Sequence, residues 1–143
     1  MRTKIKIKKL CINAALPEKA TEGSAGYDLV AIDYVYDNDE KYHVYGTGLA
    51  LELPPGYEAQ IRPRSSIRKS SFMLVNSPGT IDSDYRGELM VTFKEIDDRE
   101  QFYEIGDRIA QLIIKKVPDI ELEEVSDLTE TDRGEGGFGS SGS

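Results

Sequence analysis

Cysteine and histidine are almost missing from this 143-residue chain, which contains one of each, Cys11 and His43. A single cysteine cannot form an intramolecular disulfide, and these two side chains cannot supply the ligand set of a zinc site. Cys11 lies between Leu10 and Ile12, so we predict a buried structural thiol rather than a nucleophile. His43 has no evident serine or carboxylate partner beside it and is predicted to be a strand residue. These shortages argue against a disulfide or zinc scaffold and suit a reducing cytoplasm.

Long apolar runs are also missing. No segment approaches the roughly 18 apolar residues that a membrane-spanning helix requires. The basic N-terminus, residues 1–8, alternates lysine with isoleucine, whereas a signal peptide has an unbroken apolar stretch after its charges. The formal net charge of −8 makes a polyanion such as DNA an unfavourable partner. We therefore expect a soluble, cytoplasmic protein that binds neither a membrane nor nucleic acid.

What the chain does contain is alternation of apolar and polar residues with period two, which is typical of strands. Turn-forming glycine and proline separate these stretches, and the length suits one domain, so the pattern predicts an all-β barrel or sandwich. Serines before an apolar and basic run predict one short helix at about residues 65–71. The predicted strands include residues 4–7, 49–53, 57–61, 89–93 and 120–123.

The C-terminal residues change character, because the chain becomes polar after residue 128 and then rich in glycine. Such a segment cannot form a core of its own, and it could be a flexible terminus or a remnant of an expression linker. Arg133 and Phe138 nevertheless place a cation and an aromatic ring among the glycines, which favours a functional segment. We predict a β-barrel domain over residues 1–128 and a flexible arm over residues 129–143 that closes over a site.

Two segments could bind a phosphate chain, which requires cations and many hydrogen-bond donors. Residues 62–69 contain four cations and two hydroxyls where a strand ends and a helix is predicted to begin. The arm adds Arg133, Ser140 and unhindered backbone amides. Neither segment contains the lysine of a P-loop, and no helix is predicted after the arm's glycines, so Walker and Rossmann sites are excluded.

Hydrolysis of a phosphate chain also needs a group that positions water. Asp82 is the best-placed carboxylate, in a turn between two apolar segments that suggests a hairpin. An aspartate is ordinarily ionised at neutral pH, so it would act mainly by orienting the water. Taken alone, the turn could equally be a solvated loop rich in aspartate and glycine.

Five short motifs remove that ambiguity. They occur in order at residues 25–29, 63–66, 79–88, 106–113 and 133–142, and nearly the whole chain is covered. Together they resemble the trimeric dUTPase family. The resemblance implies a distorted, jelly-roll-like β-barrel with one short helix, assembled as a homotrimer with shared sites, that hydrolyses dUTP to dUMP and pyrophosphate with Mg²⁺.

The resemblance also assigns residues to roles. It implies that Asp82 holds the attacking water, that Gln111 bonds near the α-phosphate, and that Asp28 either orients the motif arginine or holds metal-bound waters without ligating the metal directly. Phe138 would stack on the uracil and Arg133 would reach the γ-phosphate, in the same or a neighbouring subunit. The implied substrate-binding residues are Arg64, Ser65, Ser66, Asn76, Gly79, Thr80, Ile81, Tyr85, Arg133, Phe138, Gly139 and Ser140.

Small departures and two alternatives stay open. Many relatives have glycine at the position of Ser66, and Arg68 and Lys69 replace smaller residues, which is expected to alter the phosphate contacts. A dCTP deaminase shares the fold but needs a glutamate pattern that is missing after Gly87. Some phage relatives bind a repressor through the same surface, and a repressor partner would be expected of this chain if it came from a phage.

Overall fold

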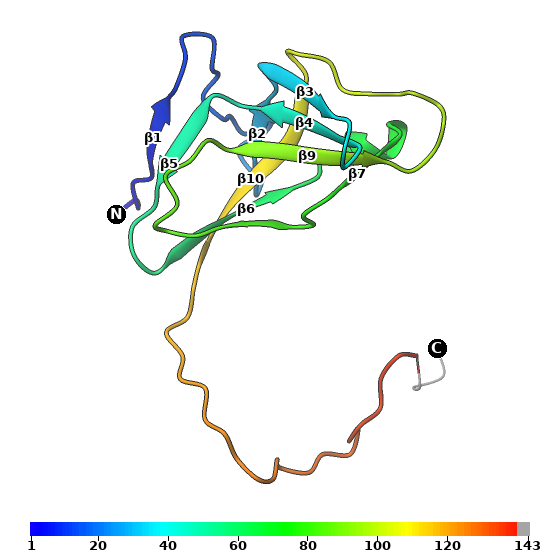
Figure 1. The fold of residues 1–143 in the computed structure, drawn as a ribbon. Helices are drawn as coiled ribbons and strands as arrows, with labels where there is room; N and C mark the ends of the chain where they lie inside the picture. Colours follow the sequence, from blue (N-terminus) through cyan, green and yellow to red (C-terminus); the bar gives the residue numbers. More distant parts are fainter. Residues whose placement is uncertain (140–143) are drawn as a thin grey trace.

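The computed structural model describes residues 1–139 and contains ten strands and one 3₁₀-helix in that range. The all-β prediction is confirmed, and the one helical turn lies where the serines predicted it (Figure 1). The elements are β1 (Lys6–Lys9), β2 (Tyr27–Val30), β3 (Asp33–Asp37), β4 (Tyr42–Gly46), β5 (Leu49–Glu52), β6 (Tyr57–Arg62), η1 (Ser65–Lys69), β7 (Phe72–Leu74), β8 (Gly79–Ile81), β9 (Met90–Glu95) and β10 (Arg108–Lys116).

The strands form two four-stranded antiparallel sheets and one two-stranded sheet. One large sheet has the order β2-β10-β6-β8, the other has the order β3-β4-β9-β7, and β1 pairs with β5. Alternate residues of these strands face one shared core, which includes Leu29, Ile61, Val91, Phe93 and Leu112. The other face of the first sheet is therefore left for polar residues.

Four of the five segments predicted as strands are strands, with ends shifted by a few residues. The prediction of a strand at residues 120–123 is wrong for the isolated chain. Ile120 and Leu122 are exposed, and no described strand pairs with them. Alternation alone does not make a strand, since the backbone also needs a neighbour to receive its hydrogen bonds.

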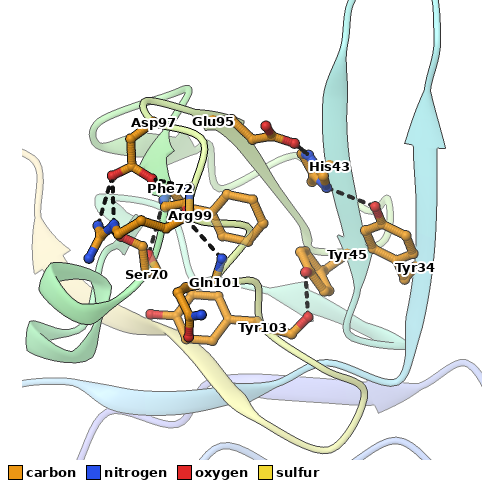
Figure 2. Close-up of polar contacts among 11 residues, drawn as sticks. Tyr34, His43, Tyr45, Ser70, Phe72, Glu95, Asp97, Arg99, Gln101 and Tyr103 are labelled. Carbon is orange, nitrogen blue, oxygen red and sulfur yellow. Dashed lines mark hydrogen bonds and ion pairs between the residues drawn. The ribbon is translucent and has the colours of Figure 1, made fainter.

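The prediction for Cys11 is wrong as well, because the thiol is exposed. Its apolar neighbours Leu10 and Ile12 lie in the turn after β1 rather than in a strand facing the core, and they are 46% and 98% exposed. His43, by contrast, is confirmed as a strand residue of β4. It is buried, and both ring nitrogens have hydrogen-bond partners (Figure 2). Nδ1 lies 2.7 Å from the Tyr34 hydroxyl, and Nε2 lies 2.8 Å from Glu95 Oε1.

The hairpin suggested around Asp82 is also corrected. β8 pairs with β6 in one sheet, whereas β9 pairs with β4 and β7 in the other. Residues 82–89 therefore connect the two sheets across the end of the molecule. The turn itself is confirmed, since the Tyr85 amide donates to the Asp82 carbonyl at 3.1 Å.

The C-terminal segment leaves the body after β10 (Figure 1). The Val117 amide donates to the Gly56 carbonyl at 2.9 Å, and residues 118–135 are exposed throughout. The detached segment thus begins before residue 129, the boundary that composition suggested. Within residues 1–139, no helix is long and apolar enough to cross a membrane.

Candidate active site

The centre of the candidate site is an ion pair between two motifs that are far apart in the sequence. Arg64 Nε donates to Asp28 Oδ1 at 3.0 Å, and both side chains are largely buried. Arg64 Nη1 also donates to the Arg108 carbonyl at 3.0 Å. This contact is the one expected if Asp28 orients the arginine, and Asp28 Oδ2 makes no hydrogen bond within residues 1–139.

Gln111 lies beside this pair because of the sheet register. It pairs with Asp28 on one side and with Arg62 on the other, so all three side chains emerge on the polar face of the sheet. The Gln111 amide nitrogen donates to the Pro63 carbonyl at 2.9 Å. Because this hydrogen bond fixes the amide nitrogen, the amide oxygen of Gln111 points toward Gly26.

Gly26 is the residue that makes room for Gln111. A Cβ at position 26 would overlap Gln111 Oε1 and would come within 3.1 Å of two carbons of that side chain. We expect Gly26→Ala to displace Gln111, to lower kcat/KM by roughly tenfold, and to destabilise the fold by about 1–3 kcal/mol. Steady-state kinetics and thermal unfolding measure both effects. Gly23→Ala is the matched control, because a Cβ there meets nothing within 4 Å; equal effects at both positions would contradict the packing account.

The serines of the second motif begin η1. Ser65 is exposed at its first position, and no side chain caps the helix. Ser66 Oγ lies 3.0 Å from Tyr103 Oη and accepts a long contact of 3.5 Å from Arg64 Nη1. We call Asp28, Arg64, Ser65, Ser66 and Gln111 the phosphate cluster. It presents one cation, two hydroxyls and an amide, which are groups that can bind phosphate oxygens.

Six of the other predicted residues lie within residues 76–85, which we call the uracil loop: Asn76, Gly79, Thr80, Ile81, Asp82 and Tyr85. β8 is an edge strand, so the backbone groups of Gly79, Thr80 and Ile81 that face away from β6 have no partner strand in the described chain. Such unpaired N–H and C=O groups can donate hydrogen bonds to a ligand and accept them from it. Tyr85 Oη donates to the Glu88 carbonyl at 2.9 Å, and its ring lies against Gly87, where a Cβ would overlap it.

One chain does not bring Asp82 and Gln111 into a single cleft. Asp82 lines a cleft of about 590 Å³ with residues 55–58 and 117–119. Gln111 lines another of about 580 Å³ with Ala25, Arg62 and Pro63, together with Ser77 and Pro78 at the start of the uracil loop. The strand register shows the separation: Ile81, next to Asp82, pairs with Ala59 of β6, whereas Gln111 pairs with Arg62 of β6. Ala59 and Arg62 are three residues apart, which at roughly 3.3 Å per residue is about 10 Å along the strand. We call the Asp82 cleft and the Gln111 cleft the two half-sites.

The arm is likewise separate from both half-sites in this chain (Figure 1). Arg133 Nε donates to the Gly136 carbonyl at 2.7 Å, and Phe138 is fully exposed. Gly139 and Phe138 both have positive φ, so the chain turns sharply here. Asn76 is exposed in the uracil loop. Ser140, predicted to bind substrate, lies outside the described residues.

Comparison with known proteins identifies this arrangement. Residues 13–142 match the family model described as dUTPase. The chain belongs to the dUTPase family. It is 48% identical over 141 residues to the deoxyuridine 5'-triphosphate nucleotidohydrolase of Hydrogenobaculum sp. (strain Y04AAS1), with 97% of this chain and 98% of that protein covered. The protein of the same name from Rickettsia felis is 49% identical over 144 residues, with 98% and 97% covered.

Solved dUTPase structures share the fold. Staphylococcus bacteriophage 80alpha dUTPase with dUPNHPP superposes with a TM-score of 0.79 at 28% identity, covering 98% of this chain and 99% of that chain. A mutant dUTPase from phage phi11 of S. aureus, at 24% identity, has a TM-score of 0.71 over 87% of this chain and 97% of that chain. The structure of that protein describes the coordination of a structural Mg(II) ion.

Sequence reasoning missed two contributors to the site. The Arg108 backbone carbonyl accepts from Arg64, and the Tyr103 hydroxyl contacts Ser66. No residue pattern marks a carbonyl as a ligand of an arginine. Tyr103 follows Phe102 in an acidic loop, and only the folded chain shows that its hydroxyl reaches η1.

Proposed function

We propose that this chain hydrolyses dUTP to dUMP and pyrophosphate, which supplies dUMP for thymidylate synthesis and keeps uracil out of DNA. The phosphate cluster carries the proposal. Its arginine, hydroxyls and amide suit the phosphates of a nucleotide. Its central contacts, Arg64 with Asp28 and Gln111 with Pro63, link three of the five motifs. The named relatives are deoxyuridine 5'-triphosphate nucleotidohydrolases over nearly their full length.

In this reaction Asp82 orients a water molecule in line with the α-phosphorus. The water oxygen forms a bond to phosphorus, the bond from phosphorus to the bridging oxygen breaks, and pyrophosphate leaves. The released proton passes to Asp82 and then to solvent. Arg64 and the hydroxyls of Ser65 and Ser66 hold the phosphate chain and offset its charge, and Gln111 orients the α-phosphate.

Selection of base and sugar is proposed for the uracil loop. The free backbone edge at Gly79, Thr80 and Ile81 presents donors and acceptors to the uracil edge, with Asn76 shaping the pocket. Tyr85 is held rigidly by Glu88 and Gly87. Its ring would pack under the deoxyribose, where a 2′-hydroxyl would clash, so UTP would be rejected by a steric rather than an electrostatic effect.

Magnesium fits this donor set as a metal held mainly by the substrate. Among residues 1–139 there is no group of three or more metal-ligating side chains. Mg²⁺ keeps several waters and is commonly bound through one or two carboxylates and substrate phosphates. Asp28 Oδ2 could hold such a water, while Oδ1 stays with Arg64. When bound, the ion would neutralise phosphate charge.

A homotrimer with shared sites is proposed because each chain carries two half-sites. Asp82 and Gln111 line different clefts, and the arm contacts neither. Subunits related by a rotation axis can bring the uracil loop of one chain to the phosphate cluster of the next and place an arm over both. Closure of the arm would then exclude bulk water and bring Arg133, Phe138, Gly139 and Ser140 to the nucleotide.

Residues 120–123 lie between β10 and the arm, and we propose that they dock on a neighbouring subunit. β1 pairs only with β5, so one of its edges is unpaired within the described chain. Around β1, Lys4, Lys6 and Lys8 alternate with isoleucines packed on the core, while Glu121 and Glu123 alternate with Ile120 and Leu122. An added strand would match apolar with apolar residues and acid with base.

Charge exchange tests this docking. We expect Glu121→Lys with Glu123→Lys to raise the trimer dissociation constant by roughly tenfold, because like charges would face each other across the strand pair. Adding Lys4→Glu and Lys8→Glu should restore it. Sedimentation velocity over a concentration series measures the assembly. Dissociation that is not rescued would contradict docking on β1.

Product analysis tests the function itself. With Mg²⁺ and dUTP, the enzyme should release dUMP and pyrophosphate; dUTP formed from dCTP would instead establish the deaminase.

A cytoplasmic location follows from the proposed role in nucleotide metabolism. A repressor partner would be expected only if the chain came from a phage, and it would compete with dUTP.

A further inference from the structure

The segment η1, which carries Ser65 and Ser66, has few contacts of its own that fix its position: Ile67 packs partly against the core, and two backbone hydrogen bonds close the turn. η1 is a five-residue 3₁₀-helix with no side-chain cap and no buried residue. Short 3₁₀ turns are weak, because their hydrogen-bond geometry is poor and each turn fixes several dihedral angles for few bonds. The placement of Ser65 and Ser66 therefore depends on contacts with the rest of the chain.

Residues 96–103, which we call the clamp segment, hold the C-terminal end of η1. Arg99 Nη2 donates to the Ser70 carbonyl at 2.7 Å (Figure 2). The Ser71 amide donates to the Gln101 carbonyl at 2.9 Å, and the Gln101 amide donates to Ser71 Oγ at 3.0 Å. Asp97 holds Arg99 in place at 2.8 Å, and the hydrogen bond from Arg99 lowers the pKa of Asp97 to about 2. The pair therefore stays charged at neutral pH.

Tyr103, at the end of the clamp segment, reaches the other end of η1. Its ring packs against Phe72 and Phe93, with centroids 6.0 and 5.5 Å away. Its carbonyl accepts from the Tyr45 hydroxyl at 2.6 Å (Figure 2). Burial raises the pKa of Tyr45, so that hydroxyl keeps its proton and remains a donor. Tyr103 is thus anchored by the core at its ring and at its backbone.

The anchored Tyr103 then presents its hydroxyl to Ser66, at 3.0 Å. Ser66 Oγ already accepts from Arg64 Nη1 at 3.5 Å. A hydroxyl has one donor hydrogen and two acceptor positions. If Tyr103 also donates to Ser66 Oγ, both acceptor positions are used and the serine hydrogen is left to point at an anion.

We propose that Tyr103 is a positioning residue of the phosphate cluster, whose hydroxyl orients Ser66 as a hydrogen-bond donor to the triphosphate. This rests on the proposed function. Tyr103 does not touch the substrate itself. It transmits the rigidity of the aromatic core to a segment that has little rigidity of its own.

Tyr103→Phe removes the hydroxyl and keeps the packed ring. We expect the KM for dUTP to rise about five- to tenfold and kcat to stay within about twofold of the wild-type value. The lost contact would bind the phosphate chain equally in the ground state and the transition state. Affinity for a non-hydrolysable imido analogue of dUTP should fall by the same factor, while binding of deoxyuridine, which has no phosphate, should not change. Tyr36→Phe is the matched control, because the Tyr36 hydroxyl makes no hydrogen bond within residues 1–139, and it should leave both parameters unchanged.

A double-mutant cycle decides between positioning and a general loss of structure. Tyr103→Phe should have no further effect in a Ser66→Ala background, because its target is gone. Additive effects, an equal loss of deoxyuridine binding, or no effect of Tyr103→Phe would overturn the proposal. Thermal unfolding of each variant accompanies the cycle. If wild-type protein does not hydrolyse dUTP, the proposed function fails instead, and the analogue-binding cycle still tests the Tyr103–Ser66 coupling.

Discussion

Asp82→Asn should abolish most turnover of dUTP while leaving nucleotide binding intact. The amide has nearly the shape of the carboxylate but cannot accept a proton from water or orient it with a full negative charge. Loss of a positioned base typically costs about 10² to 10⁴-fold in rate, and we expect kcat to fall within that range. Single-turnover kinetics measures the rate, and titration with an imido analogue of dUTP measures the affinity.

Asp84→Asn is the matched control for that experiment. Asp84 is exposed two positions farther along the same loop, and its side chain makes no hydrogen bond or ion pair within residues 1–139. The control should retain the wild-type kcat. If Asp82→Asn turned over dUTP as fast as Asp84→Asn, Asp82 would lose its role and the solvated-loop interpretation of its turn would return.

Deletion of residues 133–143 should lower kcat/KM by on the order of 100-fold or more, because the nucleotide would stay open to water and would lose the contacts of Arg133 and Phe138. The deletion leaves residues 120–123, proposed to dock on a neighbour, in place. Residues 118–135 are exposed, so the free energy of unfolding should change by no more than about 0.5 kcal/mol. Steady-state kinetics and denaturant unfolding measure the two effects.

A full-length variant separates the arm's side chains from its length. Arg133→Ala with Phe138→Ala keeps the glycine-rich backbone and should reproduce most of the loss in kcat/KM. An unchanged rate in both the deletion and the double substitution would reduce this segment to a linker. A loss only in the deletion would assign the effect to the backbone amides of the arm.

The sequence predicted the elements whose local pattern and surroundings agree. β5 and β6 alternate in the sequence and face the core in the structure, and the serines at positions 65 and 66 do begin a helical turn. Residues 120–123 alternate equally well but form no strand in the described chain. A strand is a property of a pair of segments, and sequence shows only one member of the pair.

Pairing also explains what was missed around the site. The turn at Asp82 was predicted, but its two flanking segments belong to different sheets, so the hairpin was not formed. The contact of Arg64 with Asp28 was among the expected possibilities, whereas the link from Tyr103 to Ser66 was not. That link depends on the path of the clamp segment over η1, which no local pattern encodes.

Mixing two inactive variants tests the central claim, that the catalytic site combines groups from different subunits. Asp82→Asn disables the uracil loop of its own chain, and Arg64→Ala disables the phosphate cluster of its own chain. The two proteins are unfolded together in equal amounts, refolded, and assayed for pyrophosphate release. Shared sites predict that roughly a quarter of the wild-type activity returns, since about that fraction of sites pairs an intact Asp82 with an intact Arg64 from a neighbour. Activity no higher than that of the separate variants would show that each chain builds its own site and would contradict the account.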